Sequence, residues 1–199
     1  MIVKEISFDE EARDRLINGV NKIANAVKST LGARGKTVLI ESENHIGGVT
    51  ITKDGVTVAK SIALMDPTED LAVRIIREAA EKTATEAGDG TTTAIVLTQA
   101  IIDAAQQRIK KEMNLTDIIR NLQISTDIIL KSLDKKKKKI SAKKLIDVAS
   151  ISANNDKEIG SIIAQAYELV GINGVVTVEN SDGSDTWFST SEGMRIKRG

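Results

Sequence analysis

The residues best suited to chemistry lie in one short stretch, Ala87-Gly88-Asp89-Gly90-Thr91-Thr92-Thr93, between two long runs with helical periodicity. Its two glycines allow a sharp backbone turn, Asp89 offers a hard oxygen ligand, and the threonines open the next helix with exposed N–H groups and hydroxyls. Unpaired N–H groups and a partial positive charge at a helix N-terminus attract anions. The stretch predicts a cradle for a phosphate and its Mg²⁺, although a plain turn capped by Asp89 or a threonine fits the same residues.

A second candidate carboxylate is Asp54, in Lys53-Asp54-Gly55, between two runs with strand-like alternation, Val49 to Thr52 and Val56 to Ala59. An Asp-Gly step between such runs predicts a β-hairpin turn. In one interpretation Asp54 serves only the turn. In the other, its carboxylate lies at the hairpin tip and orients a water molecule beside a phosphate.

The segment Gly35-Lys36-Thr37 resembles the end of a phosphate-binding P-loop, but the pattern fails in two ways. The first required glycine would fall at position 30, which is Thr30. A P-loop joins a strand to a helix, whereas here a helical pattern precedes the segment and a β-like run, Thr37 to Ile40, follows it. We interpret the segment as a turn, with Gly32 ending the preceding helix.

Composition excludes several other classes of function. The chain has 199 residues, of which 41% are hydrophobic and 28% charged, and Lys+Arg and Asp+Glu balance at 28 each, so no net charge favours nucleic acid or an anionic membrane. No cysteine and a single histidine, His45, exclude disulfides, thiolate metal sites and histidine clusters. The N-terminus lacks the apolar run of a signal peptide, and no run approaches the ~20 residues of a membrane span. These features predict a reducing, cytoplasmic setting.

A series of expected helices positions the candidate residues. Apolar residues at helical spacing predict a helix over residues 12–31. Asp66-Pro67-Thr68-Glu69 has the residue types of a helix start, and that helix runs to Gly88. The helix opened by Thr91 is apolar on nearly every side up to residue 105, so we expect it to be the buried centre of the domain. A further helix covers about residues 115–133.

The composition changes at Lys135 to Lys139, where five like charges repel one another and predict an exposed connection and a domain boundary. Zero net charge and the lack of interleaved aromatic residues disfavour a nucleic-acid patch there. Beyond it we expect helices over residues 142–149 and 159–169, a strand over Gly174 to Glu179, and a second β-like run around Trp187-Phe188. With a short strand at residues 2–8, the expected fold class is mainly α with small β hairpins, an α+β fold.

Five motifs occur in the order in which they appear in a group I chaperonin of the GroEL type, and the chain resembles that family. They are Thr30-Leu31-Gly32, Thr52-Lys53-Asp54-Gly55, Ala87-Gly88-Asp89-Gly90-Thr91-Thr92-Thr93, Ile151-Ser152-Ala153-Asn154 and Gly174-Val175-Val176-Thr177-Val178-Glu179. The final Glu192-Gly193-Met194 and Arg198-Gly199 also resemble the family where its substrate-binding apical domain begins. The resemblance covers the whole chain, but only the first part of the family's much longer chains.

The resemblance implies a domain organisation. Residues 1–133 resemble the N-terminal part of the family's helical equatorial domain, which binds ATP and makes most ring contacts. Residues 134–191 resemble the ascending part of a small α/β intermediate domain, and residues 192–199 the truncated start of the apical domain. The lysine run lies where the family often has a proline at the lower hinge, so the hinge behaviour of the family does not transfer directly.

The resemblance also implies roles for individual residues. Asp89 matches the Mg²⁺ ligand, and Asp54 matches a catalytic carboxylate that positions the attacking water. A potassium ion would be held at Thr30, Lys53 and Thr92. Ala33 replaces the proline usual after Thr-Leu-Gly, which leaves that loop less constrained. The matched ATP-binding positions are Thr30, Leu31, Gly32, Ala33, Lys53, Asp89, Gly90, Thr91, Thr92 and Thr93.

The function that the resemblance implies is that of an ATP-dependent protein-folding chaperone, with ATP, Mg²⁺ and K⁺ as cofactors. Its expected partners are other copies in a homo-oligomeric ring of stacked heptamers, a GroES-type co-chaperonin and non-native client proteins, with neither nucleic acid nor a membrane. The alternative is a truncated, non-catalytic fragment with a structural or interaction role only. In the family, segments beyond the apical domain complete the ATP site, so we expect residues 1–199 alone to hydrolyse ATP poorly.

Overall fold

The structure is a computed structural model that describes residues 6–32, 34–42, 48–110, 112–171 and 173–193. The chain divides into two compact units, Met1–Asn114 and Leu115–Gly199. The described residues form seven helices and one two-stranded sheet, which confirms the expected fold class. No helix in these ranges is long and apolar enough to span a membrane.

Helix α1 (Asp9–Lys28) is the first core element of unit 1, and it covers most of the helix expected over residues 12–31. The helix ends at Lys28 rather than at Gly32, and Ser29 to Gly32 follow as a turn. Of the strand expected over residues 2–8, residues 2–5 lie outside the described ranges and Ile6 to Phe8 are not in a strand. The face that α1 buries follows helical spacing and consists of Gly19, Val20, Ile23, Ala24 and Val27.

Helix α3 (Pro67–Ala87) begins and ends where the sequence predicts. The Asp66 carboxylate accepts hydrogen bonds from the N–H groups of Thr68 and Glu69 at 2.8 and 3.0 Å, and Pro67 occupies the first turn. Arg15 of α1 donates two bonds to the same carboxylate, at 2.9 and 3.0 Å. This bidentate pair attaches the start of α3 to α1.

Strands β1 (Val38–Glu41) and β2 (Val49–Thr52) form the antiparallel sheet, with Val38 opposite Thr52. The second expected strand, Val56 to Ala59, is wrong, because these residues belong to helix α2 (Gly55–Ser61). The consecutive residues Val58 and Ala59 are both buried in the core. In a strand they would point to opposite faces, whereas a helix that packs against α1 and α3 buries both.

Helix α4 (Thr91–Arg108) follows the glycine-rich turn, as expected, but it is not the buried centre of unit 1. Its buried residues are Thr91, Ile95 and Gln99, spaced four apart, while Leu97 and Ile101 are exposed. The Gln99 amide donates to Asn21 of α1 at 2.7 Å. The described part of unit 1 packs α1 and α3 against one side of α4, which leaves its other apolar side uncovered.

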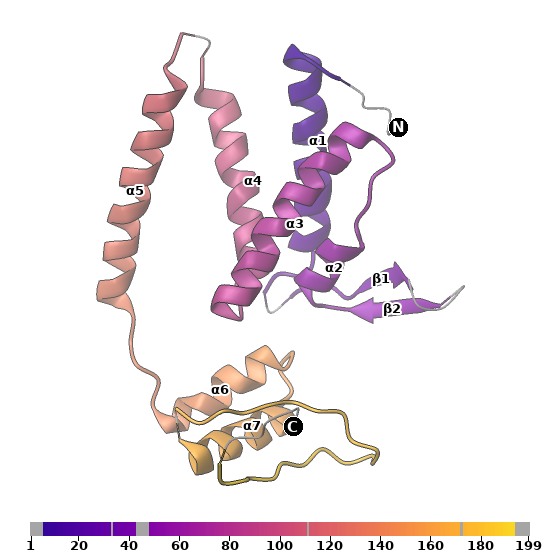
Figure 1. The fold of residues 1–199 in the computed structure, drawn as a ribbon, viewed down its shortest axis with the longest axis vertical. Helices are drawn as coiled ribbons and strands as arrows, with labels where there is room; N and C mark the ends of the chain where they lie inside the picture. The colour runs from indigo at the N-terminus through magenta and orange to yellow at the C-terminus, as the bar shows by residue number, and fades with distance from the viewer. Residues whose placement is uncertain (1–5, 33, 43–47, 111, 172, 194–199) are drawn as a thin grey trace. The chain divides into compact units, whose positions relative to one another are not determined.

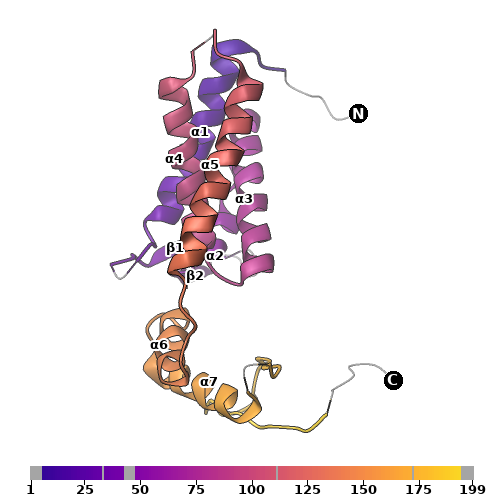
Figure 2. The same cartoon turned by 90° about the vertical axis from the view of Figure 1, so that its left-hand side faces the viewer.

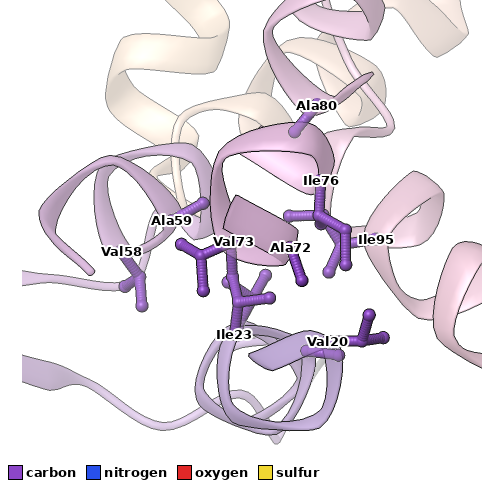
Figure 3. Close-up of a cluster of buried hydrophobic side chains, with 11 residues drawn as sticks. Val20, Ile23, Val58, Ala59, Ala72, Val73, Ile76, Ala80 and Ile95 are labelled. Atoms are coloured by element: carbon purple, nitrogen blue, oxygen red, sulfur yellow. The ribbon is translucent and has the colours of Figure 1, made fainter. Parts of the chain in front are cut away.

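The core of unit 1 draws side chains from four helices (Figure 3). Helices α1 and α3 contribute most of it, α2 contributes two residues and α4 contributes Ile95. Ala and β-branched residues predominate, and such small side chains let the helices approach closely. The labelled members in Figure 3 are Val20, Ile23, Val58, Ala59, Ala72, Val73, Ile76, Ala80 and Ile95.

Unit 2 contains helices α5 (Leu115–Lys136), α6 (Ala142–Ser152) and α7 (Lys157–Val170) (Figure 2). All three were expected, although α5 and α6 extend three residues further than predicted. Helices α6 and α7 pack directly on each other, and a Cβ at Gly160 would lie 2.7 Å from the main chain of Ser150. Helix α5 has no buried residue, and the lysine run at its C-terminal end is exposed, as expected.

The strand expected over Gly174 to Glu179, and the β-like run around Trp187-Phe188, are both wrong. Residues 173–193 contain turns, bends and irregular chain without a strand. A single run of β-forming residues needs a neighbouring strand to satisfy its N–H and C=O groups. The described part of unit 2 supplies no such neighbour to this segment.

Candidate functional site

The segments that carry candidate residues lie at one end of unit 1. The C-terminal ends of α1 and α3, helix α2 and the N-terminal end of α4 lie together there (Figure 1). The closest approach is at Gly55, where an added Cβ would lie 2.0 Å from Thr92 Oγ1 and 3.1 Å from Val27 Cγ1. The backbone after Asp54 therefore packs directly on the first turn of α4 and on the last turn of α1.

The turn between α3 and α4 leaves the start of α4 without a side-chain cap. Gly88 and Gly90 adopt φ values of 73° and 88°, a left-handed conformation that glycine reaches without strain. Gly90 is the N-cap residue, and it offers no side chain to the N–H groups of the first turn. Asp89 is exposed, and its Oδ1 accepts from the N–H of Gly90 at 2.6 Å. Within the described part of the chain, first-turn N–H donors without a side-chain cap therefore follow directly after a carboxylate, as a bound phosphate and its metal ion require.

The sequence predicts Asp54 at a hairpin tip, and this prediction is wrong. Asp54 is the N-cap residue of α2. Its Oδ1 accepts from the N–H of Val56 at 3.3 Å. Its Oδ2 accepts from the N–H of Thr57 at 3.0 Å and from the Thr57 hydroxyl at 2.7 Å. The Asp54 N–H in turn donates to Thr52 Oγ1 at 3.0 Å, which links the cap to the end of β2.

The surroundings of Asp54 favour its ionised form. Partial burial alone raises the pKa of Asp54, but the hydrogen bonds from the Thr57 hydroxyl, the Thr57 N–H and the Val56 N–H, with the charge of Lys60, outweigh it. The pKa of Asp54 therefore lies below its usual range. A carboxylate of this kind accepts hydrogen bonds well and accepts a proton poorly, which suits orientation of a water molecule more than its deprotonation.

The loop after α1 brings Thr30 to the same end of unit 1. Thr30 is buried, and its hydroxyl and N–H both donate to the carbonyl of Val27, at 2.7 and 3.0 Å. A Cβ at Gly35 would lie 2.1 Å from the Thr30 carbonyl oxygen, so the main chain at Gly35 packs directly on this carbonyl. Leu31 is exposed and Gly32 has a φ of 78°, while Ala33 lies outside the described residues.

The remaining candidate residues differ in exposure. Lys53 is exposed, Thr91 is buried, Thr92 is half-buried and Thr93 is exposed. Within the described ranges, no group of three or more His, Cys, Asp or Glu side chains is placed to hold a metal ion. The structure thus brings the first turns of α2 and α4 together. Asp89, directly before the N-cap of α4, is the candidate carboxylate ligand for a metal ion there.

The sequence predicts only a turn glycine at Gly55 and no role for Thr57, and the structure places both residues at this site. Both belong to the first turn of α2, a helix that the hairpin interpretation did not predict. The available signal was Asp54 itself, because aspartate is among the residues preferred at a helix N-cap.

Comparison with known proteins identifies the family of this chain. Residues 23–199 match the model of the TCP-1/cpn60 chaperonin family. The chain belongs to the TCP-1/cpn60 chaperonin family. The match includes all the candidate residues, from Thr30 to Thr93.

Solved chaperonin structures have the same fold as this chain. The chaperonin gp146 from the bacteriophage EL 2 (Pseudomonas aeruginosa), crystallised in the presence of ATP-BeFx, is 30% identical, with a TM-score of 0.69 over 79% of this chain and 28% of that chain. A group III chaperonin in the open state is 25% identical, with a TM-score of 0.65 over 80% of this chain and 32% of that chain. The present chain therefore spans about a third or less of the length of these chaperonins.

Proposed function

We propose that this chain is the nucleotide-binding part of an ATP-hydrolysing chaperonin ring subunit, of the group I, GroEL type. The observation that carries the proposal is the contact of Gly55, the residue after Asp54, with Thr92 in the uncapped first turn of α4. The family match and the five ordered motifs support the same assignment. ATP hydrolysis would drive movements of a domain that holds non-native proteins.

In this proposal the nucleotide phosphates bind at the first turn of α4. The N–H groups of Thr91, Thr92 and Thr93 belong to that turn, and Gly90 contributes no side-chain acceptor to them. The helix dipole adds a partial positive charge at the same place. A phosphate oxygen would supply the acceptors that a capping side chain supplies at α2, α3 and α7.

The proposed Mg²⁺ site uses Asp89. Mg²⁺ commonly binds one or two carboxylates together with substrate phosphates and water, so a single aspartate beside the phosphate site fits this ion. Asp89 Oδ1 is engaged with the N–H of Gly90, and we assign metal coordination to Oδ2. A K⁺ ion would be held by the carbonyl of Thr30 with Lys53 and Thr92, as the family resemblance implies.

The proposed role of Asp54 is to orient the attacking water. The first turn of α2 holds its carboxylate ionised, and the buried residues Val58 and Ala59 anchor that helix in the core. A carboxylate fixed in this way stabilises the transition state without binding the nucleotide itself. We assign catalysis to Asp54 and the remaining nucleotide contacts to Thr30, Leu31, Gly32, Ala33, Lys53 and Gly90.

The proposed partners follow from the family. They are other copies of the subunit in stacked seven-membered rings, a GroES-type co-chaperonin and non-native client proteins, and a cytoplasmic location accords with them. In the proposed domain organisation, residues 1–133 are equatorial, residues 134–191 are intermediate and residues 192–199 begin the apical domain. Unit 1 ends at Asn114, and the assignment of α5 to the equatorial domain stays a prediction.

Substitutions at two carboxylates test the function in a full-length version of the subunit that contains residues 1–199. Asp54→Asn keeps a good N-cap residue and removes the charge, so kcat for ATP should fall about a hundredfold or more while KM changes little. Asp89→Ala should abolish Mg²⁺-dependent hydrolysis and leave helix content, measured by circular dichroism, unchanged.

The matched control is Asp156→Asn. Asp156 caps α7 in unit 2 by accepting from the N–H groups of Glu158 and Ile159 at 2.9 and 3.0 Å, so the change removes a cap charge outside unit 1. The control should keep normal turnover. Normal turnover in Asp54→Asn or Asp89→Ala would refute the corresponding assignment.

A further inference from the structure

The Thr57 hydroxyl makes a contact that helix capping does not require. Among the described helices, α3 and α7 also begin with an aspartate cap, Asp66 and Asp156, and in each the Oδ1 atom accepts both N–H bonds of the first turn. The third residue after these caps is Glu69 or Ile159, and neither carries a hydroxyl. At Asp54 the bonds are divided between the two oxygens, and the hydroxyl of Thr57 adds a third.

This arrangement distinguishes the two oxygens of Asp54. An ionised carboxylate oxygen accepts about two hydrogen bonds. Oδ2 is filled by the N–H and the hydroxyl of Thr57, at 3.0 and 2.7 Å. Within the described part of the chain, Oδ1 accepts one long bond from the N–H of Val56, at 3.3 Å. One acceptor position therefore remains on Oδ1, and the short bond at Oδ2 opposes rotation of the carboxylate.

We infer that Thr57 is the positioning residue for the catalytic carboxylate: its hydroxyl holds Oδ2 of Asp54 and directs Oδ1 to accept a hydrogen bond from the attacking water. The inference rests on the proposed function of Asp54. We assign Thr57 a role that acts through Asp54, with no direct contact to the nucleotide or the water. The hydroxyl is oriented as a donor because its acceptor is ionised, and bonds of this type are stronger than neutral ones.

The position of Thr57 is itself fixed by packing. Gly55 abuts Thr92 of α4, and the adjacent Val58 and Ala59 are buried against the core. The first turn of α2 thus has a defined distance from the phosphate-binding turn of α4. Loss of the hydroxyl would leave this turn in place and remove the shortest of the three hydrogen bonds that hold the carboxylate.

The experiment measures steady-state ATP hydrolysis by the complete subunit and its Thr57→Val and Thr57→Ser variants. Valine has the shape of threonine without the hydroxyl, and serine keeps the hydroxyl. We expect Thr57→Val to lower kcat about ten- to hundredfold with KM within about twofold, because misplacement of a catalytic group by a fraction of an ångström slows the chemical step. Thr57→Ser should restore kcat to within about threefold of the unmodified subunit.

The control is Thr126→Val, which removes a threonine hydroxyl that donates to the carbonyl of Leu122 in α5, and it should leave kcat unchanged. The double variant Asp54→Asn with Thr57→Val should be no slower than Asp54→Asn alone, because the two residues act as one unit. A Thr57→Val kcat within about twofold of normal, or no recovery with serine, overturns the inference. Normal turnover in Asp54→Asn would instead overturn the proposed function, so the two failures are distinguishable.

Discussion

The contact between Gly55 and Thr92 makes a quantitative prediction about the Gly55→Ala variant. The new Cβ would lie 2.0 Å from Thr92 Oγ1, 3.2 Å from Thr92 Cβ and 3.1 Å from Val27 Cγ1. The first distance is more than 1 Å too short for van der Waals contact, so either the Thr92 side chain or α2 must move. Rotation of Thr92 brings its methyl group toward the same space, since β-branched side chains have few rotamers in a helix.

The expected cost follows from two opposing effects. Overpacking in a well-packed region costs about 1–3 kcal/mol. Alanine is a better helix former than glycine by up to about 1 kcal/mol, which offsets part of that cost. We expect a net loss of about 1–2 kcal/mol in the free energy of unfolding, or a Tm lower by about 5–10 °C for a unit of this size.

The assay is thermal unfolding of the 199-residue chain followed by circular dichroism, with two matched backgrounds. Thr92→Ala removes the Oγ1 atom, so in this background Gly55→Ala should cost less than half as much. Thr92→Ser keeps Oγ1, so the cost should remain. Equal destabilisation in the alanine and serine backgrounds would refute the reasoning, because the clash with Oγ1 would then not be its cause.

Three further predictions follow from the structure. Gly19→Ala should destabilise unit 1 more than Gly55→Ala, by about 3 kcal/mol, because the opposing atom is the main-chain oxygen of Glu69 at 2.2 Å and cannot rotate away; a smaller loss in urea unfolding would contradict this. The N–H of Leu64 and the side chain of Arg74 hold the pKa of Asp70 below its usual range, so its contribution to stability is present above the unfolded-state pKa of about 3.9 and is lost as pH falls through the lower folded-state value. Asp70→Asn should therefore flatten the acid side of the stability profile measured by urea unfolding, and an unchanged slope would count against that assignment. Finally, the 199-residue chain alone should hydrolyse ATP poorly, and K⁺- and Mg²⁺-dependent turnover equal to that of a complete chaperonin would show that these residues form a full site.

The local features of this protein could be predicted from its sequence because they depend on neighbouring residues. The Asp66-Pro67 start of α3 and the glycine turn before α4 are encoded in a few consecutive residues, and both are confirmed. Helical periodicity likewise predicts α1, α5, α6 and α7 to within a few residues at most ends. The order of the short motifs indicates the chaperonin family, which the match over residues 23–199 confirms.

Tertiary structure decided the features that depend on distant partners. Four residues, Val56 to Ala59, are too few to distinguish a strand from a helix, and burial of both Val58 and Ala59 against other helices selects α2. Gly174 to Glu179 has the composition of a strand but no neighbouring strand in the described chain, so it remains irregular. The proximity of Gly55 to Thr92 is a result of packing alone, because a close approach between two helix starts leaves no trace in either local sequence except the absent side chain of Gly55.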